Sequence, residues 1–429
     1  MKKINVGIVG LGTVGQGAIE ILQKHHADFC RDQEVDLQLV AVSSRHDQAA
    51  HALGLLDIYS ADLAHVTQNP EVDIVVELIG GVDAAYDCVR AAIAAGKCVV
   101  TANKALIATH GRELMRLAAE QGVEIAFEAS VGGGIPIIGP LRHTLASNRI
   151  ESVLGIVNGT TNYMLTQMSS GDLDYATALS EAQALGYAEA DPTADVEGYD
   201  AAAKAAILAT IAFNTDVRLH QVATEGITRL APIDLAAAAK AGYAVKLLAI
   251  AQRVGADGSS GIDVRVHPTL LPQAHALASV QGVFNAIFVV GDFVGETMFY
   301  GRGAGAGPAA SSVVGDLIEL ARHRAFREVV AQPIWDTEDL PVLGLDAVQG
   351  RFYLRLTVAD EPGVLSAVAA VLASHAISIA SLTQQQSEPG QAELLFFTHE
   401  TAETAVRKAT EDLQKASLLA SEALVLHIL

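Results

Sequence analysis

The chain has 429 residues, and its 49 Asp and Glu against 28 Lys and Arg give a formal net charge of −21 at pH 7. This length exceeds what one hydrophobic core supports, so two or three domains are expected. The acidic balance, with no cluster of Lys and Arg to offset it, argues against nucleic-acid binding. Lys, Gly or Asp interrupt every apolar stretch before the roughly 20 residues of a membrane span.

The amino terminus and the cysteines bear on location. Met1-Lys2-Lys3 precedes an apolar run, but glycines at 7, 10, 12 and 15 interrupt that run, which makes it a poor signal peptide. Cys30, Cys88 and Cys98 are odd in number and lack CxxC spacing, so we expect reduced thiols. These features predict a soluble cytoplasmic protein that acts on small molecules, without membrane or nucleic-acid partners.

The first motif is a glycine-rich loop between a strand and a helix. Residues 3–9 form an apolar run typical of a buried strand, and a helical pattern starts soon after residue 15. The loop between them has the GxGxxG spacing of a dinucleotide site, in which a pyrophosphate rests on the helix N-terminus. A purely structural glycine turn is the alternative. The predicted cofactor-binding residues of this loop are Gly10, Leu11, Gly12, Thr13, Val14 and Gly15.

Further apolar runs alternate with helical segments, which predicts an α/β fold of the Rossmann type with a doubly wound parallel sheet. The expected strands are 37–43, 72–78, 98–102 and 123–128. The second of the sheet's strands ends in Ser43-Ser44-Arg45-His46, with no carboxylate before Asp47. Two hydroxyls and a cation suit a 2′-phosphate, so NADP is favoured over NAD. Alternatively, Arg45 is an ordinary surface residue.

An acidic segment follows in the middle of the chain. Asp200 and Lys204 are four residues apart and share a helix face, and Thr210 is the only other polar side chain from Ala201 to Phe213. A solvent-exposed ion pair or a snorkelling lysine is one interpretation. A lysine held partly dry for proton transfer is the other.

The same segment carries a resemblance to a known family. It is similar to the homoserine dehydrogenase signature at Ala182, Gly186, Tyr187, Asp191-Pro192, Asp195, Gly198, Asp200 and Lys204, and the resemblance continues through the rest of the chain. The resemblance implies catalytic roles for Lys204 and Lys104, and substrate binding by Glu189, Asp195 and Asp200. It also places Lys104, Gly186 and Gly301 at the cofactor, and Asn158 to Asn162 (NGTTN) in a substrate-domain turn. Without the family, Lys104 is equally well a loop lysine at the end of a strand.

A triple-glycine loop closes the strand at 123–128. From the sequence alone it is a tight connection, although such a loop can direct carbonyl oxygens at a hard cation beside a carboxylate. The family resemblance implies a structural monovalent-cation site, for Na⁺ or K⁺, at Glu128 and the carbonyls of Val131, Gly133 and Ile135.

The pattern then changes to an α+β substrate and dimerisation domain. A helix near 136–147, a strand at 151–157 and strands around 243–253, 262–268 and 286–290 indicate an antiparallel sheet with helices on one face. The helix from Ala309 to Ala325 is expected to return to the cofactor.

After a Pro- and Gly-containing linker, the order βαββαβ with the turn Asp360-Glu-Pro-Gly363 is ferredoxin-like and resembles an ACT domain. A purely structural oligomerisation role is the alternative to amino-acid sensing. The expected domains are 1–135 (NADP-binding), 136–330 (catalytic), 331–350 (linker) and 351–429 (ACT).

Together these features predict an NADP-preferring homoserine dehydrogenase, with NAD as a weaker cofactor, in threonine, methionine and isoleucine biosynthesis. The enzyme would interconvert L-aspartate 4-semialdehyde and L-homoserine, with L-threonine as effector and a homodimer or homotetramer as the assembly. The alternatives are an oxidoreductase of another aldehyde and alcohol pair, or a non-catalytic sensor of NADP and an amino acid. A degenerate sensor should have lost Lys204, Asp200 or Glu189, and all three are present.

Overall fold

The structure is a computed structural model that describes residues 2–171, 173–255, 261–326, 338–344 and 348–429. The chain divides into two compact units. The first comprises residues 1–153, 206–220 and 285–339, and the second comprises 154–205, 221–284 and 340–429. Divisions fall inside two strands, β7 (Ile150–Ile156) and β11 (Phe284–Gly291), and inside a helix, α10 (Tyr199–Phe213).

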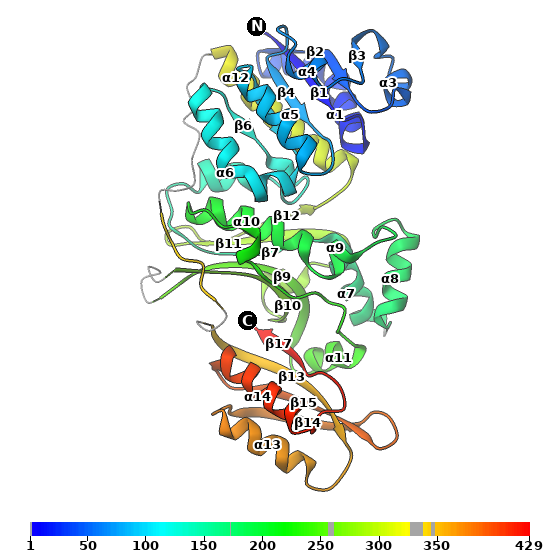
Figure 1. The fold of residues 1–429 in the computed structure, drawn as a ribbon, viewed down its shortest axis with the longest axis vertical. Coiled ribbons are helices and arrows are strands. Elements are labelled where there is room, and N and C mark those ends of the chain that lie inside the picture. Colours follow the sequence, from blue (N-terminus) through cyan, green and yellow to red (C-terminus); the bar gives the residue numbers. More distant parts are fainter. Residues whose placement is uncertain (1, 172, 256–260, 327–337, 345–347) are drawn as a thin grey trace. The chain divides into compact units, whose positions relative to one another are not determined.

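A six-stranded parallel sheet of order β3-β2-β1-β4-β5-β6 forms the centre of the first unit (Figure 1). Its strands are β1 (Lys2–Val9), β2 (Val35–Ser43), β3 (Tyr59–Ser60), β4 (Ile74–Glu77), β5 (Cys98–Thr101) and β6 (Ile125–Ala126). Apolar runs fill the strands because helices cover both faces of the sheet. The chain reverses its direction of travel through the sheet between β1 and β4, where such folds bind ligands at the carboxyl ends of the strands. The predicted doubly wound parallel sheet is confirmed.

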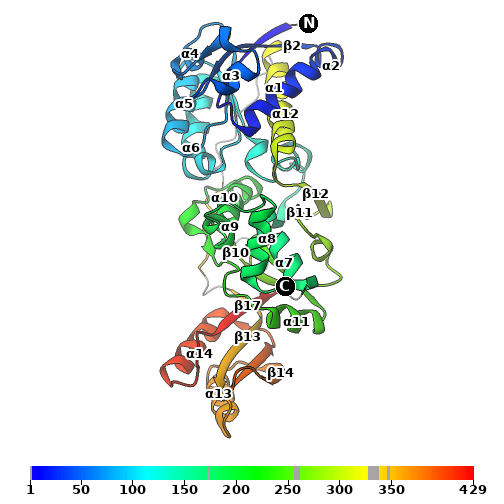
Figure 2. The ribbon, with the colours of Figure 1, turned by 90° about the vertical axis from the view of Figure 1, so that its right-hand side faces the viewer.

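Helices lie on both sides of this sheet, with α5 and α6 on one face and α1 and α12 on the other (Figure 2). The close approach of α1 to α12 favours a glycine, because a Cβ on Gly17 would lie 3.0 Å from the Ala310 Cβ. Helix α12, which the sequence placed at the end of the catalytic domain, therefore packs on the six-stranded parallel sheet. The helices of this unit are α1 (Thr13–Lys24), α2 (His26–Asp32), α3 (Gln48–Ala52), α4 (Ala64–Thr67), α5 (Asp83–Ala94), α6 (Lys104–Gln121) and α12 (Ala306–Phe326).

The helix expected near 136–147 is present in a shorter form. Residues 138–144 are helical, and Pro140–Thr144 form a π-helical turn. Before this turn the amides of Ile137, Ile138 and Gly139 donate to the Glu128 carboxylate. The carboxylate thereby caps the start of this helix, where the first amides have no partner within the helix. The first unit also holds most of β7, β11 (Phe284–Gly291) and β12 (Gly295–Arg302), which are neighbours in the order β12-β11-β7.

In the second unit the two long strands β9 (Tyr243–Val254) and β10 (Gly261–Pro272) pair antiparallel. Short β8 (Ala223–Thr224) pairs with β10 in parallel, so the sheet is mixed. The accompanying helices are α7 (Gly159–Gly171), α8 (Tyr175–Ala184), α9 (Thr193–Val196), the start of α10, and α11 (Pro232–Lys240).

The carboxyl-terminal module has the predicted βαββαβ order. Its elements are β13 (Gln349–Ala359), α13 (Val364–Ser374), β14 (Ile379–Gln386), β15 (Gln391–Thr398), α14 (Glu403–Lys415) and β17 (Leu424–Ile428), with a short β16 (Thr401–Ala402). Alternate residues of β13 and β15, such as Leu354 and Phe396, pack under α13 and α14 in one apolar core.

The module is built into the second unit, which the sequence does not predict. Strand β17 pairs in parallel with β10, with Thr269 opposite His427. On the face of β13 away from the two helices, Tyr353 Oη and Arg355 Nε each lie 2.8 Å from Oδ1 of buried Asp234 on α11. Half of the expected linker lies outside the described residues. In its described part, Pro341 O accepts a 2.9 Å hydrogen bond from Ile262 N.

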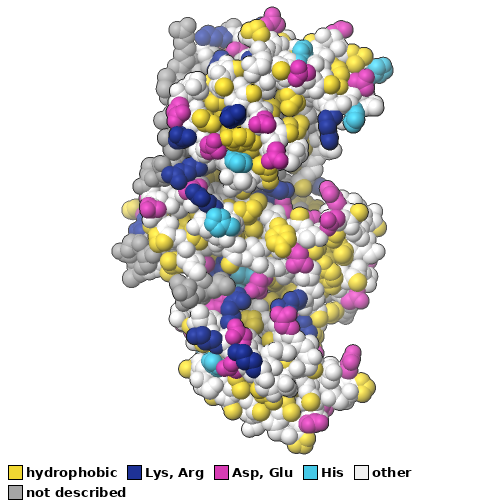
Figure 3. Space-filling model, in the orientation of Figure 1, with side chains coloured by type: hydrophobic (Ala, Val, Ile, Leu, Met, Phe, Trp, Pro, Cys, Tyr) yellow, Lys and Arg dark blue, Asp and Glu magenta, His cyan; other side chains and the backbone are white. Residues whose placement is uncertain are grey.

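Among the described helices, none is long and apolar enough to cross a membrane. Acidic and basic side chains are interspersed on the face that Figure 3 shows.

Candidate active site

The glycine-rich loop has the geometry of a nucleotide site. Gly10 has φ +102°, and a Cβ there would lie 2.5 Å from the Leu78 carbonyl oxygen. Gly12 caps helix α1 with no side-chain hydrogen bond, and a Cβ at Gly12 would meet nothing within 4 Å. The first amides of α1, at Thr13, Val14 and buried Gly15, come directly after Gly12 and so lie next to this open space. Uncapped helix amides next to open space fit a phosphate group.

A cavity of about 850 Å³ opens from this loop within the first unit. It is lined by Gly10, Leu11 and Gly12, and also by Arg45 and its neighbours at the end of β2. The predicted phosphate-binding loop and Arg45, which is predicted to bind the 2′-phosphate, therefore line the same cavity. None of the described residues that line it is acidic, although a ribose 2′-hydroxyl site normally uses a carboxylate.

Lys104 lies half-buried at the start of α6, where a network between two parallel strand ends fixes the backbone. Asn103 caps the helix by accepting from Leu106 N at 3.0 Å, and its side-chain amide donates to the Gly81 carbonyl at 2.7 Å. Its own backbone N–H donates to Thr101 Oγ1. Thr101 in turn donates to Glu77 at 2.5 Å, which ties the end of β5 to the end of β4.

Glu77 is a member of this network that the sequence did not single out. Its carboxyl is fully buried, accepts from Ile79 N at 2.7 Å, and has its pKa raised to about 7 by burial. An acidic residue that ends an apolar strand was the available signal. Its place beside the β4–Gly80 turn makes it a positioning group for the loop that borders the cofactor cavity.

In the second unit, Lys204 is the centre of a buried polar cluster. Its Nζ donates to Oδ2 of Asp200 at 2.7 Å and to the Val157 carbonyl at 2.6 Å. Lys204 and Asp200 are each 8% exposed, so the solvent-exposed ion pair is excluded. Around them α10 presents alanines, and the lysine points across to the end of β7.

Asn158 joins the acidic residues to this cluster. Its Nδ2 donates to Asp195 at 2.7 Å and to Asp200 at 2.9 Å, while its Oδ1 accepts from Thr161 N. The structure thus brings together three of the predicted residues, Asp195, Asp200 and Lys204, through a side chain to which the sequence assigned no role. The available signal was the polar NGTTN run directly after an apolar strand.

The second asparagine of that run has a structural task. Asn162 donates to the carbonyls of Gly282 and Phe284 at 2.9 and 3.1 Å. Lys246 donates to the side-chain oxygen Oδ1 of Asn162 at 3.1 Å, and burial lowers the pKa of this lysine to about 8.

Three other predicted residues lie outside the buried cluster. Glu189 is exposed, and its carbonyl accepts from Gln183. Gly186 is exposed with φ +73° on the turn after α8. Gly301 belongs to the first unit, near the end of β12, where a Cβ would lie 3.2 Å from Ile135 Cγ1.

The proposed cation loop is tightly hydrogen-bonded. Both Glu128 carboxylate oxygens accept backbone amides from residues 137–139, and the Gly133 carbonyl accepts from Ser312 at 2.7 Å. The Glu128 amide donates to buried Asp316, whose pKa burial raises well above its usual range. The loop therefore brings acidic groups and carbonyl oxygens together. The Glu128 carboxylate oxygens, however, already accept hydrogen bonds from backbone amides.

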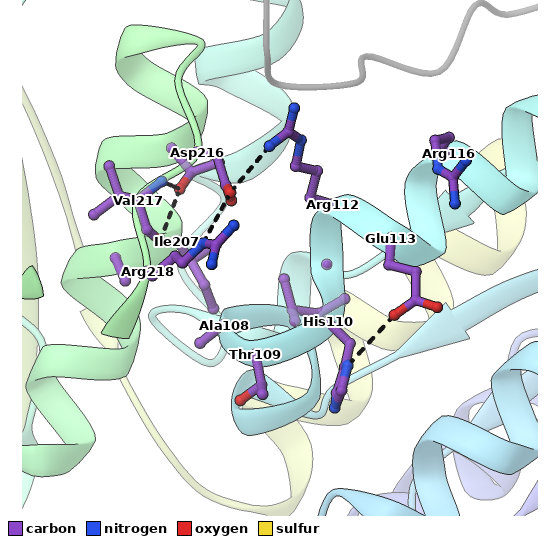
Figure 4. Close-up of a pocket in the computed structure, with 14 residues that line it drawn as sticks. Ala108, Thr109, His110, Arg112, Glu113, Arg116, Ile207, Asp216, Val217 and Arg218 are labelled. Atoms are coloured by element: carbon purple, nitrogen blue, oxygen red, sulfur yellow. Dashed lines mark hydrogen bonds and ion pairs between the residues drawn. The ribbon is translucent and has the colours of Figure 1, made fainter. Parts of the chain in front are cut away.

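A second cavity of the first unit contains none of the predicted site residues. It measures about 430 Å³ and lies between α6 and residues 206–218 (Figure 4). Asp216 lies between Arg112 and Arg218, at 3.4 and 3.3 Å. We interpret these ion pairs as structural contacts that hold α6 against the segment that follows α10.

Comparison with known proteins identifies the chain's family. It is 43% identical over 427 residues to a homoserine dehydrogenase of Pseudomonas aeruginosa, with 96% of each chain covered. The chain belongs to the homoserine dehydrogenases. A Synechocystis homoserine dehydrogenase is 41% identical over 99% of both chains. Residues 136–318 match the homoserine dehydrogenase family, 10–128 its NAD-binding domain, and 352–417 the ACT domain.

Solved structures agree with this assignment. A homoserine dehydrogenase from Thiobacillus denitrificans is 41% identical and superposes with a TM-score of 0.94, covering 100% of this chain and 99% of that one. A hyperthermophilic archaeal homoserine dehydrogenase in complex with NADPH is 28% identical, with a TM-score of 0.62, and covers 74% of this chain and 98% of that one. The chain is thus an NAD(P)-dependent oxidoreductase, which supports catalysis over the sensor alternative.

Proposed function

We propose that this homoserine dehydrogenase interconverts L-aspartate 4-semialdehyde and L-homoserine with NADP as its preferred cofactor, and that Lys204 handles the proton. The observation that carries the proposal is the buried cluster of Lys204, Asp200, Asn158 and Asp195, because a dry, fixed ammonium is suited to an oxygen that gains negative charge.

The nicotinamide cofactor, when bound, supplies or accepts the hydride. When the aldehyde is reduced, its carbonyl oxygen becomes an alkoxide and needs a proton. Two of the three N–H groups of the Lys204 ammonium donate hydrogen bonds to Asp200 and to the Val157 carbonyl. The third N–H group is left to donate to the substrate oxygen. Lys204 thereby stabilises the developing charge and donates the proton.

We assign the remaining predicted residues by charge. Asp195 and Asp200 provide carboxylates for the amino-acid end of the substrate, and Glu189 supplies a further one from the exposed turn. Lys104 is the second cation of the site, and Gly186 and Gly301 contribute backbone on the cofactor side. Each carboxylate favours the substrate's ammonium group over a neutral analogue.

The NADP preference rests on Arg45. Its position in the wall of the cavity that contains Gly10 and Gly12 supports a contact with the 2′-phosphate, as does the lack of acidic side chains among the described lining residues. A 2′-phosphate gains charge-assisted hydrogen bonds from such a guanidinium.

The activity is tested by following the NADPH absorbance band after adding L-aspartate 4-semialdehyde, and in reverse with NADP and L-homoserine. Turnover in both directions supports the substrate assignment. A chain that oxidises other alcohols but not L-homoserine would contradict it.

We extend the proposal to a structural monovalent cation held by the carbonyls of Val131, Gly133 and Ile135, with Glu128 providing negative charge. The φ values of +74° and +57° at Gly132 and Gly133 let the loop fold back on itself. Because the Glu128 oxygens accept amides, its side chain acts on the cation through charge. Stability that rises with KCl or NaCl, but not with tetramethylammonium chloride, is the expected result.

For regulation, we propose that the ACT domain binds L-threonine in a cavity of about 360 Å³ beside the turn at Asp360 to Gly363. Gly363 has φ +95° and caps α13 without a side-chain bond, which supports capture of a carboxylate by helix amides. Threonine as the end product of the pathway is the family's implication.

A homodimer or homotetramer is the assembly we propose. Strand β12 alternates half-buried and exposed residues, and its exposed side includes Met298 and Tyr300, with Phe293 89% exposed in the preceding turn. These exposed apolar side chains, with Glu296 and Arg302 at the two ends of the same strand face, suit a partner surface.

A further inference from the structure

Four side chains with metal-binding atoms converge at the amino-terminal edge of the parallel sheet. His26 and Cys30 are four residues apart on α2, and so share one face of that helix. Asp36 and Gln38 are two residues apart at the start of β2, and so share one face of that strand. This edge is opposite the carboxyl ends of the strands, where the cofactor loop lies.

The donor atoms are close to one another. Those of His26, Cys30 and Asp36 all lie within 4.8 Å of each other. His26 Nε2 is 2.8 Å from Asp36 Oδ1 and 3.8 Å from Cys30 Sγ. The side-chain nitrogen of Gln38 is 3.3 Å from His26 Nε2 and 2.6 Å from Asp36 Oδ1.

These separations are near those of a tetrahedral zinc centre. With Zn–N and Zn–O near 2.0–2.1 Å and Zn–S near 2.3 Å, neighbouring donor atoms lie roughly 3.3–3.6 Å apart. The Asp36 to His26 distance has to open by about half an ångström, and the Cys30 to His26 distance is already within a few tenths. Rotation of the Gln38 amide presents its oxygen in place of its nitrogen.

We propose that His26, Cys30 and Asp36, with Gln38 or water as the fourth ligand, form a zinc site that ties α2 to β2. Imidazole, thiolate and carboxylate together select Zn²⁺ over Mg²⁺ or Ca²⁺, which take oxygen ligands. Cys30 is the one cysteine of the chain that is not buried, since Cys88 and Cys98 lie in the core. The His26 and Asp36 side chains are 41% and 21% exposed, so an ion can enter from solvent.

Charged groups of both signs surround the site. Asp36 contributes a carboxylate, and Lys3 is a cation near it. The nearby Arg31 guanidinium is engaged by Asp28 and Asp32 at 2.8 and 2.7 Å. When zinc binds, the Cys30 thiol loses its proton to solvent and the sulfur becomes the metal ligand, so the affinity rises with pH.

A hydrogen-bonded cluster of His26, Asp36 and Gln38 without metal is the competing account. It gives Cys30 no essential role, since the thiol is a weak hydrogen-bonding group. Zinc binding, in contrast, depends on the Cys30 sulfur.

The test uses the full chain after chelator treatment. Zn²⁺ is titrated against a chromophoric chelator, and Co²⁺ is added separately as a spectroscopic probe. We expect one tight site per chain, a Co²⁺ spectrum with a thiolate charge-transfer band, and a melting temperature raised by about 4 °C or more at a hundredfold excess over Kd. Cys30→Ser should remove the band, and both Cys30→Ser and His26→Gln should weaken Zn²⁺ binding at least about tenfold.

His25→Gln is the matched control, because His25 is the adjacent imidazole and contacts Asp28 at 3.4 Å instead. It should keep the band and the affinity. Both Cys30 and His26 are partly exposed, so the variants should fold, and their metal-free melting temperatures check this. Equal Zn²⁺ affinity in the wild type and Cys30→Ser, or no charge-transfer band in the wild type, would overturn the proposal.

Discussion

The ammonium of Lys204 lies 2.7 Å from Oδ2 of Asp200, one turn earlier on α10, and both side chains are buried. Burying such a pair costs desolvation that its attraction often only offsets, so the pair is weak evidence for stability. The contacts from Asn158 and the Val157 carbonyl keep the pair satisfied. We therefore interpret the pair as a group preorganised for proton transfer.

Removing the bridge between the two aspartates should impair catalysis. Asn158→Ala deletes the Nδ2 donor that Asp195 and Asp200 share, so the two carboxylates are no longer linked and Asp200 keeps its contact with Lys204. We expect kcat/KM for aspartate semialdehyde to fall by roughly 10–100-fold, a loss of about 1.4–2.7 kcal/mol. Steady-state kinetics measure this. Ser170→Ala, on the exposed side of α7, should leave kinetics unchanged. An Asn158→Ala enzyme with wild-type kcat/KM would remove the bridge from the site.

Arg45→Ala should change the choice of cofactor. We expect NADPH binding to weaken by roughly 1.5–3 kcal/mol, about ten- to a hundredfold, because a hydrogen bond to a charged group is lost. NADH binding should barely change. Fluorescence titration of both cofactors measures the difference, with Arg31→Ala as a control arginine held by Asp28 and Asp32. Equal losses for both cofactors would show that Arg45 does not bind the 2′-phosphate.

The buried Glu77 should make stability depend on pH. Burial raises its pKa from 4.5 to about 7, so the folded protein binds a proton that the unfolded chain has released. This contribution is fully present below pH 4.5 and is lost as pH rises through 7, a change of about 3 kcal/mol. Denaturation of the wild type and Glu77→Gln at pH 5 and pH 8 measures it.

The variant should gain stability relative to the wild type between pH 5 and pH 8. Glu71→Gln is the matched control, because Glu71 is an exposed residue just before β4. The same pH dependence in the wild type and Glu77→Gln would mean that the Glu77 carboxyl does not retain its proton in the folded state.

Threonine should inhibit through the turn at Asp360. Deleting the ACT domain is a poor test, because it would strip β17 from β10 and leave Asp234 buried without Tyr353 and Arg355. Asp360→Asn in the full chain is cleaner, because it removes a carboxylate that can bind the effector's ammonium. We expect threonine to raise KM or lower kcat several-fold in the wild type, a coupling of about 1–3 kcal/mol.

The Asp360→Asn enzyme should need at least about tenfold more threonine for half-inhibition. Glu400→Gln is the control, since this exposed carboxylate lies on the same module but does not line the cavity. A wild-type enzyme that is active and indifferent to threonine would leave the module as a sensor of another ligand or an oligomerisation device.

Local patterns predicted the parts of the fold that local chemistry determines. The strand, glycine loop and helix at residues 3–22 and the βαββαβ order are confirmed because periodicity and turn residues specify them within short windows. The helix expected at 136–147 is shorter in the structure, and its start is capped by Glu128, a long-range contact that the sequence did not reveal.

Contacts between distant segments could not be read from the sequence. Asp234 meets Tyr353 across 119 residues, and β17 pairs with β10 although each segment alone reads as an ordinary strand. Asn158 was visible only as part of a motif, since its bridging role needs Asp195 and Asp200 in place. Such long-range pairings depend on the whole packed fold, whereas propensity describes neighbours.

The most direct test of the account is a single-turnover measurement on Lys204→Ala. Enzyme saturated with NADPH is mixed with L-aspartate 4-semialdehyde, and oxidation is followed by absorbance. We predict a rate lower by roughly 10²–10⁴, with the Kd for NADPH changed little, because the variant loses a positioned proton donor. A Lys204→Ala enzyme that oxidises NADPH at close to the wild-type rate would contradict the assignment of proton transfer to the buried Lys204–Asp200 pair.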